Sequence, residues 1–143
     1  MSVALLDVSV LIALFDRGHV RSDEVAAWFA DNATAGWSTC AITENGFVRI
    51  VSQATYPHPI PTADAISRLN RACAHPSHRF WNCDRSITQP GLLTPGQAIH
   101  SSQITDSYLL ALAVAHDGCF VTLDRRITPT AVRGARADHL VAL

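Results

Sequence analysis

Apolar residues occur along this chain in two recurring patterns, short unbroken runs and longer stretches with helical spacing. The short runs predict strands at residues 3–6, 36–40, 79–81, 119–123 and 139–142. The stretches in which apolar residues return every three or four positions predict helices at 8–15, from 22, from 42, at 62–74 and at 106–116. We expect Thr105 to cap the last of these helices and Gly118 to end it.

Strands and helices therefore alternate over most of the chain, and this order favours an α/β fold. A parallel sheet covered by helices, with right-handed crossovers, satisfies the alternation. The length of 143 residues fits one domain, and no repeat or flexible linker divides residues 1–143. In such folds ligands bind beyond the carboxyl ends of the strands, so functional side chains are expected at that edge.

Four acidic residues stand where an apolar run ends or a helix begins. Asp7 and Asp124 follow predicted strands, and Glu44 and Asp106 lie in the first turns of predicted helices. Because strand ends and helix starts meet at one edge of a parallel sheet, the four side chains can converge there. Carboxylates gathered in one place repel one another, and a divalent cation resolves that conflict. An all-oxygen ligand set suits Mg²⁺ or Mn²⁺ better than Zn²⁺.

Composition narrows the class of protein. Apolar residues make up 48% of the chain and charged residues 16%, which is typical of a compact protein with a sizeable interior. All 11 basic residues are arginine. A receiver domain, a haloacid-dehalogenase-type phosphatase and a P-loop protein each need a lysine near phosphate, so the absence of lysine excludes them. No G-x-S-x-G elbow is present for a serine hydrolase.

The first residues lack the basic segment of a signal peptide, and no apolar stretch approaches the ~20 residues needed to span a bilayer. We therefore expect a cytoplasmic protein without a membrane partner. Cys40, Cys73, Cys83 and Cys119 form no C-x-x-C pair, and we expect them to be small buried side chains rather than disulfides.

With these motifs in place, the chain resembles the PIN-domain ribonucleases, and among them the VapC-type toxins of toxin–antitoxin systems. The resemblance rests on LLDVSVLI at residues 5–12, Thr43-Glu44 followed by GFVR at 46–49, TDSYLLALA at 105–113 and TLDRR at 122–126. Each motif alone occurs in many α/β proteins, whereas their order and separation together are specific. The match covers nearly the whole chain, with the least support between residues 53 and 103.

The resemblance implies a PIN-like three-layer α/β/α fold with a mainly parallel central sheet. It also implies a catalytic site that binds Mg²⁺ or Mn²⁺ and activates water to hydrolyse RNA phosphodiesters, formed by Asp7, Glu44, Asp106 and Asp124. Ser9 and Thr122 are the implied nearby hydroxyls that orient a ligand or water. The implied partners are an RNA substrate, a second copy of the chain in a homodimer, and a small antitoxin protein encoded beside it.

Each acid also has an ordinary structural interpretation. Asp7 can cap the helix that follows it, and Glu44 and Asp106 can stabilise helix dipoles by about 0.3 to 1 kcal/mol each. Asp124 can belong to a turn or pair with Arg125. A domain whose acids bind only a structural ion would be an RNA- or protein-binding module instead of an enzyme, and turnover during metal titration separates the two.

Two further groups of residues have candidate binding roles. Arg125, Arg126, Arg133 and Arg136 have only Asp138 among them, and four arginines less one aspartate leave a local excess of +3. Such a surface can hold RNA phosphates or an acidic antitoxin segment, and a solvated surface is the alternative.

The second group is Cys73, His75, His78 and Cys83, which are residue types that zinc accepts. Their separations of two, three and five match no familiar zinc motif, and Cys73 falls on the apolar face of its helix. We therefore do not expect these four residues to form a zinc site.

Overall fold

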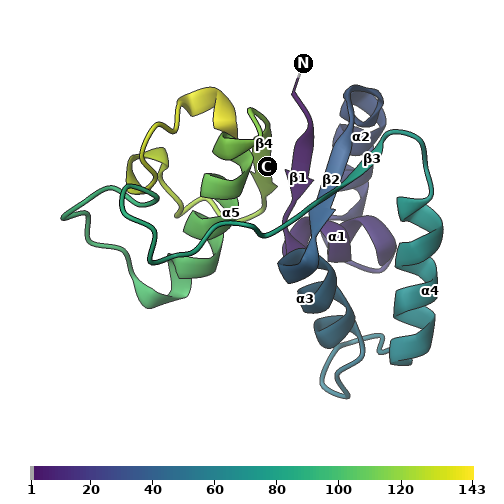
Figure 1. Cartoon of the computed structure of the whole chain (residues 1–143). Helices are drawn as coiled ribbons and strands as arrows, with labels where there is room; N and C mark the ends of the chain where they lie inside the picture. Colours follow the sequence, from purple (N-terminus) through teal and green to yellow (C-terminus); the bar gives the residue numbers. More distant parts are fainter. Residues whose placement is uncertain (1) are drawn as a thin grey trace.

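The computed structural model describes residues 2–143 and has a five-stranded sheet at its centre (Figure 1). Its strands are β1 (Ala4–Leu6), β2 (Trp37–Cys40), β3 (His78–Trp81), β4 (Cys119–Thr122) and β5 (Leu140–Ala142). The order across the sheet is β3-β2-β1-β4-β5, and every neighbouring pair is parallel. The predicted parallel sheet is therefore confirmed, with β1 as its central strand.

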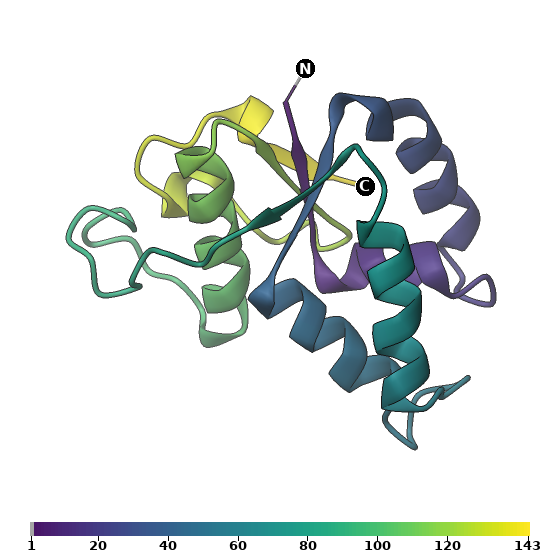
Figure 2. The ribbon, with the colours of Figure 1, turned by 45° about the vertical axis from the view of Figure 1, so that its right-hand side comes forward.

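Helices cover both faces of this sheet. They are α1 (Val8–Phe15), α2 (Ser22–Asn32), α3 (Ala41–Val51), α4 (Thr62–Cys73) and α5 (Ile104–Ala115). Successive residues of β1 point to opposite faces, so Leu6 packs with Phe47 on one side and Leu5 packs with Leu109 on the other. Figures 1 and 2 show α5 across the sheet from α1 to α4, which confirms the three-layer α/β/α arrangement. Within residues 2–143 no helix has the length and apolar character to cross a membrane.

Two strands pass almost directly into helices, and this places polar side chains at the carboxyl edge of the sheet. Only Asp7 separates β1 from α1, and α3 begins at the residue that follows β2. Gly46 lets α3 approach α1 closely, because a Cβ at that position would lie 2.6 Å from Cγ2 of Val8. The N-terminal halves of α1 and α3 therefore lie against each other at this edge.

The start of α5 differs from the prediction. A 3₁₀ turn (Ser101–Gln103) leads directly into the helix at Ile104, and Gln103 makes no side-chain capping hydrogen bond. The prediction that Thr105 caps this helix is wrong, since Thr105 lies inside the first turn.

The end of α5 depends on two residues rather than on glycine alone. Asp117 adopts the left-handed conformation with φ 50°, and the amide of Gly118 donates to the carbonyl of Ala113 at 2.9 Å. Gly118 itself is required for space, because a Cβ there would lie 2.5 Å from the carbonyl oxygen of Val3. The glycine thus lets the chain enter β4 close beside β1.

Candidate active site

Asp7 is buried in the single position between β1 and α1, with 8% of its surface exposed. It caps α1, because Oδ1 accepts a hydrogen bond from the Val8 amide at 2.7 Å. Oδ2 accepts from the Thr122 hydroxyl at 2.8 Å and from the Ser9 hydroxyl at 3.1 Å. Burial raises the pKa of Asp7, and the hydrogen bonds from Thr122, Val8 and Ser9 act in the opposite direction. Asp7 is therefore both a helix cap and a carboxylate held in one orientation.

The hydroxyls of Ser9 and Thr122 join α1 to the end of β4 around Asp7. The Ser9 oxygen accepts a hydrogen bond from the Leu123 amide at 3.4 Å, and the Thr122 oxygen accepts one from the Asp124 amide at 3.1 Å. Each hydroxyl has a single proton, which it donates to Asp7. Both residues thus position Asp7, and their direct contact with a substrate stays a prediction.

Asp124 follows β4 and forms a two-pronged ion pair with Arg126. Nη2 of Arg126 lies 2.7 Å from Oδ2, and its Nε donates to Oδ1 at 3.0 Å. The hydrogen bonds from Arg126 lower the pKa of Asp124 to about 2. The Arg125 partner considered from the sequence is wrong, because the turn after β4 directs Arg126 to the carboxylate and Arg125 to the carbonyl of Leu143.

Asp106 lies half-buried in the first turn of α5 and is affected by the charges of both other aspartates. Burial, followed by the charges of Asp7 and Asp124, raises the pKa of Asp106 to about 6, and Arg126 acts in the opposite direction. Three carboxylates from β1, β4 and α5 therefore share one negative region, and Arg126 is the cation paired to it. Such a region of oxygen ligands with surplus negative charge fits a divalent cation.

Glu44 makes different contacts from the three aspartates. Its Oε1 accepts a hydrogen bond from the Thr39 hydroxyl at 2.7 Å, and its carboxylate lies near Cys73 and His78. Glu44 is not among the charges that shift the pKa of Asp7 or Asp106. Asp7, Asp106 and Asp124 thus act on one another through their charges, although their carboxylate oxygens do not all lie within 4.8 Å of one another. Glu44 points instead toward the side of α3 that faces α4 and β3.

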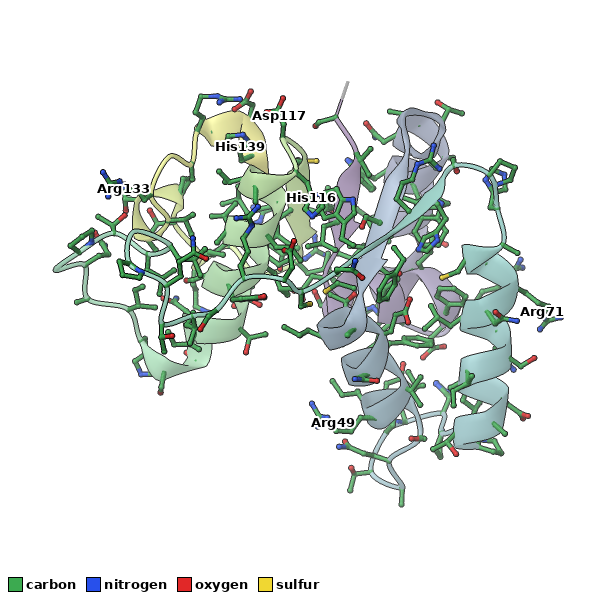
Figure 3. All side chains as sticks on the ribbon, viewed as in Figure 1. Arg49, Arg71, His116, Asp117, Arg133 and His139 are labelled. Carbon is green, nitrogen blue, oxygen red and sulfur yellow. The ribbon has the colours of Figure 1, made fainter. Side chains whose placement is uncertain are left out.

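The arginines after β4 are less available than their number suggests. Arg126 is paired with Asp124, and Arg136 lies 3.1 Å from Asp138 and 3.8 Å from Asp117. The expected local excess of +3 is therefore too large, because Asp117 and Asp124 join Asp138 in balancing it. Figure 3 shows Arg133 far from Arg49 and Arg71, so these three arginines do not form one basic surface.

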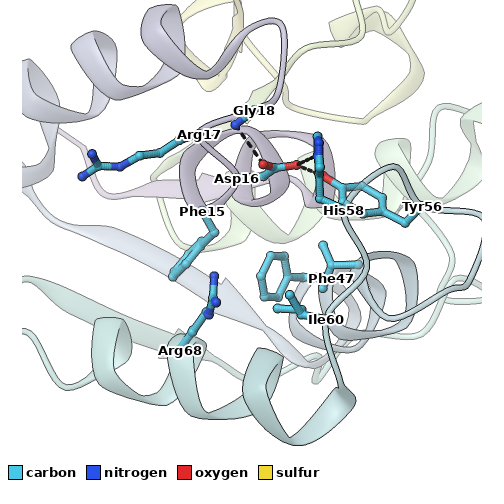
Figure 4. A pocket seen from close by; sticks show the side chains of 10 residues that line it. Phe15, Asp16, Arg17, Gly18, Phe47, Tyr56, His58, Ile60 and Arg68 are labelled. Atoms are coloured by element: carbon cyan, nitrogen blue, oxygen red, sulfur yellow. Dashed lines mark hydrogen bonds and ion pairs between the residues drawn. The ribbon is translucent and has the colours of Figure 1, made fainter.

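A cavity of about 390 Å³ lies elsewhere, at the end of α1 (Figure 4). Asp16 in its wall accepts hydrogen bonds from the Tyr56 hydroxyl and, at 2.9 Å, from the Gly18 amide. The bond from Tyr56 lowers the pKa of Asp16, and burial followed by this bond raises the pKa of Tyr56 to about 12. None of the predicted acids lines this cavity, so the candidate active site lies outside it, at Asp7, Asp106 and Asp124.

The sequence that carries this aspartate at the end of β1 and the two further aspartates has a match among known families. The family model described as PIN domain matches residues 4–132. The chain belongs to the PIN-domain family and, within it, to the VapC-type proteins.

Curated relatives and a solved structure agree with this assignment. The chain is 51% identical over 140 residues to Ribonuclease VapC44 of Mycobacterium tuberculosis, which covers 98% of this chain and 99% of that protein. Ribonuclease VapC38 of the same species is 36% identical over 126 residues, covering 85% of each chain. VapBC2 from Rickettsia felis, solved bound to promoter DNA, superposes with a TM-score of 0.58 at 13% identity, covering 92% of this chain and 96% of that one. This last likeness supports the fold.

Two features near the predicted site had no direct signal in the residue pattern. One is the ion pair of Asp124 with Arg126, since a DRR run does not indicate which arginine turns back. The other is the approach of Cys73 and His78 to Glu44, from elements about thirty residues apart. Helical spacing did place Cys73 on the inward face of α4, and that signal was compatible with a contact to α3.

Proposed function

We propose that this protein is a metal-dependent endoribonuclease that acts as the toxin of a toxin–antitoxin pair. The observation that carries the proposal is the group of three aspartates at the carboxyl edge of the sheet, in a chain half identical to a protein named Ribonuclease VapC44. The substrate class is RNA, and the reaction is hydrolysis of a phosphodiester bond.

The donor set fits the ion that this family uses. PIN-domain ribonucleases generally depend on divalent metal ions, and Asp7, Asp106 and Asp124 offer oxygen ligands of the kind that Mg²⁺ and Mn²⁺ prefer. A divalent cation supplies acidification of water and neutralisation of phosphate charge to this reaction. Asp7 and Asp106 are the principal ligands in our proposal, and Asp124 completes the set. Glu44 could join this ligand set only if its side chain broke the hydrogen bond with Thr39.

The residues of the chain have separate tasks in the hydrolysis. Ser9 and Thr122 hold Asp7 in one orientation, so little reorganisation is needed when the ion binds. Arg126, whose side chain is 70% exposed, would be free to bind a phosphate oxygen of the RNA if Asp124 served as a ligand of the ion. Arg125 lies beside it as a second phosphate contact. Water oxygen bonds to phosphorus and the 3′ oxygen leaves with a proton, which yields a 5′-phosphate and a 3′-hydroxyl.

The partners follow from the same assignment. We propose that a second copy of the chain forms a homodimer with it and that a small antitoxin protein inhibits the complex. Support comes from the name of the Rickettsia felis complex, VapBC2, in which a chain of this fold is paired with VapB. The size of the complex that forms when the neighbouring gene is co-expressed tests both partners.

An RNA- or protein-binding module with a structural ion is the second candidate. One observation favours it: Arg126 already neutralises Asp124, so that carboxylate is less available to an ion. A module of this kind would bind Mn²⁺ without cleaving RNA, whereas a ribonuclease would bind Mn²⁺ and cleave RNA.

Cleavage of total cellular RNA with and without Mn²⁺, followed by end mapping, tests the proposed function. We expect Asp106→Asn to reduce cleavage by at least about 100-fold, because a ligand of the ion is lost. Asp64→Asn is the matched control, since Asp64 occupies the first turn of α4 and is exposed. Full activity of folded Asp106→Asn, or no cleavage by the wild-type protein with Mn²⁺, would contradict the proposal. For the toxin role, expression of the gene alone should halt growth, and Asp7→Asn should restore it.

A further inference from the structure

We propose that Glu44, Cys73 and His78 form a second metal site, distinct in chemistry from the three aspartates and suited to Zn²⁺. The site joins α3, α4 and β3 and does not depend on the proposed ribonuclease activity.

The three side chains already lie at binding range of one ion. One ligand atom from each, a carboxylate oxygen, a thiol sulfur and an imidazole nitrogen, lies within 4.8 Å of the other two. Tetrahedral Zn²⁺ bonds of about 2.0 to 2.3 Å place ligand atoms roughly 3.3 to 3.8 Å apart, so these atoms must approach one another by up to about 1.5 Å when an ion binds. All three residues are half-buried, so the group is sheltered and remains reachable from solvent.

Contacts with Thr39 and Trp37 position two of the three ligands, Glu44 and His78, before any ion arrives. The buried Thr39 hydroxyl donates its one proton to Oε1 of Glu44 at 2.7 Å, so Nε2 of His78, 2.8 Å from the Thr39 oxygen, is the donor in the second bond. An ion bound at Nε2 would replace this second hydrogen bond, and the ring proton would move to Nδ1. The His78 ring also packs on Trp37, with ring centroids 4.5 Å apart. Because β2 and β3 pair with Trp37 opposite His78, the sheet register fixes this ring. The ligands thus stand on well-ordered strands and helix ends.

The protonation states are compatible with zinc binding. Burial lowers the pKa of His78, which favours the neutral imidazole that binds metals. Burial and then the charge of Glu44 raise the pKa of the Cys73 thiol. On binding, the S–H bond breaks, a metal–sulfur bond forms and the proton goes to solvent. The ion also neutralises the carboxylate that disfavours the thiolate, so one cation satisfies all three groups.

Ligand type distinguishes this site from the aspartate group. Sulfur and imidazole select Zn²⁺ or Co²⁺, whereas Mg²⁺ selects oxygen ligands. Three protein ligands leave a fourth zinc position for water or another small ligand. Of the residues first considered for zinc, Cys83 belongs to the opposite face of the sheet, where it packs with the cluster around Tyr108. It therefore serves as the matched control for Cys73.

Co²⁺ titration of the metal-free protein, kept reduced with a phosphine, tests the site. We expect a stoichiometric cobalt–thiolate charge-transfer absorption that Zn²⁺ abolishes and a large excess of Mg²⁺ does not. Cys73→Ser should remove the absorption, and Cys83→Ser should keep it. His78→Asn should weaken Zn²⁺ binding by at least about tenfold. Substitution of a residue that only hydrogen-bonds to a metal ligand already has an effect of that size, and His78 is itself a ligand.

Several outcomes would overturn the site. They are the absence of a cobalt–thiolate absorption in folded wild-type protein, its retention in Cys73→Ser, and its equal loss in Cys83→Ser. If Cys73→Ser does not fold, as judged by circular dichroism, the zinc affinity of His78→Asn tests the site in its place, and an affinity equal to that of the wild-type protein would overturn the proposal. Asp106→Asn should keep the absorption while losing RNA cleavage, so failure of the ribonuclease proposal and failure of this site are separate results.

Discussion

Asp106 shows most clearly what residue chemistry contributes to this protein. Its place in a first helical turn was expected from the sequence, whereas its pKa of about 6 arises from burial and from two distant aspartates. Asp7 and Asp124 follow β1 and β4, and the effect of their charges on Asp106 depends on distances in space that cannot be predicted from spacing along the chain. Glu44 shows the same limit, because the rotation of α3 about its own axis decides which partner its carboxylate meets.

The pKa of Asp106 leads to a prediction about pH and stability. A carboxyl group whose pKa rises from 3.8 to about 6 on folding favours the folded state below pH 4 and loses that contribution as pH rises from 4 to 6. In the presence of a chelator, Asp106→Asn removes this pH-dependent loss of folding stability. Its stability relative to wild type should therefore increase by about 1 kcal/mol between pH 4 and pH 7, a value reduced for partial exposure.

Urea denaturation of both proteins at the two pH values measures this difference. Asp64→Asn controls for the loss of a first-turn charge. A stability difference between Asp106→Asn and wild type that is the same at both pH values would show that no strained carboxylate exists at position 106.

At the scale of elements, the sequence predicted every strand and α-helix of the fold, and the errors lie at their ends. Alternation and helical spacing identify elements because they report which side chains are buried. Capping depends instead on the backbone angles of a few residues, and the turn Ser101–Gln103 before α5 made the capping prediction for Thr105 wrong. The sequence also did not show that Gly118 is needed for space, because the atom that a Cβ would meet, the carbonyl oxygen of Val3, belongs to a distant part of the chain.

Gly46 provides the test of helix packing. A methyl group at Gly46 would lie 2.6 Å from Cγ2 of Val8, so the Val8 side chain must leave its position or α1 and α3 must separate in Gly46→Ala. We expect a loss of about 1 to 3 kcal/mol of stability, larger than the gain of about 1 kcal/mol in helix propensity. Thermal or urea denaturation measures it.

A second substitution distinguishes the clash from other causes. Val8→Ala removes the methyl groups that Gly46→Ala meets, so the double variant should be more stable than the sum of the two single changes predicts. Additive losses would show that the two helices do not touch at these residues.

At the scale of the whole molecule, the sheet order gathers remote segments around one edge. β1 is central and pairs with β2 on one side and β4 on the other, so residues near both ends of the sequence meet there. Strand-helix alternation predicted that strand ends and helix starts meet at one edge, but it did not predict the strand order, because alternation alone permits several orders. In the proposed second metal site, Cys73 and His78 lie in the segment where the resemblance to PIN-domain ribonucleases has the least support, whereas Glu44 belongs to one of its motifs.

Because the aspartate group links β1, β4 and α5, an ion bound there should stabilise the whole fold. At an Mg²⁺ or Mn²⁺ concentration about 100 times the dissociation constant, linkage predicts about 2.7 kcal/mol of added stability. Differential scanning calorimetry with the ion and with chelator measures the shift in melting temperature. Asp106→Asn should lose most of the shift, and an equal shift in this variant would place the stabilising ion elsewhere.

The hydrogen bond between Thr122 and Asp7 spans 115 positions of sequence. During translation, a ribosome exposes Asp7 long before it has made Asp106 or Asp124, and the central strand then lacks its β4 neighbour. The nascent chain therefore has an incomplete set of carboxylates until Asp124 has been made. Under the proposed function, a nascent chain that stops before Asp106 carries only one of the three carboxylates and has no working active site.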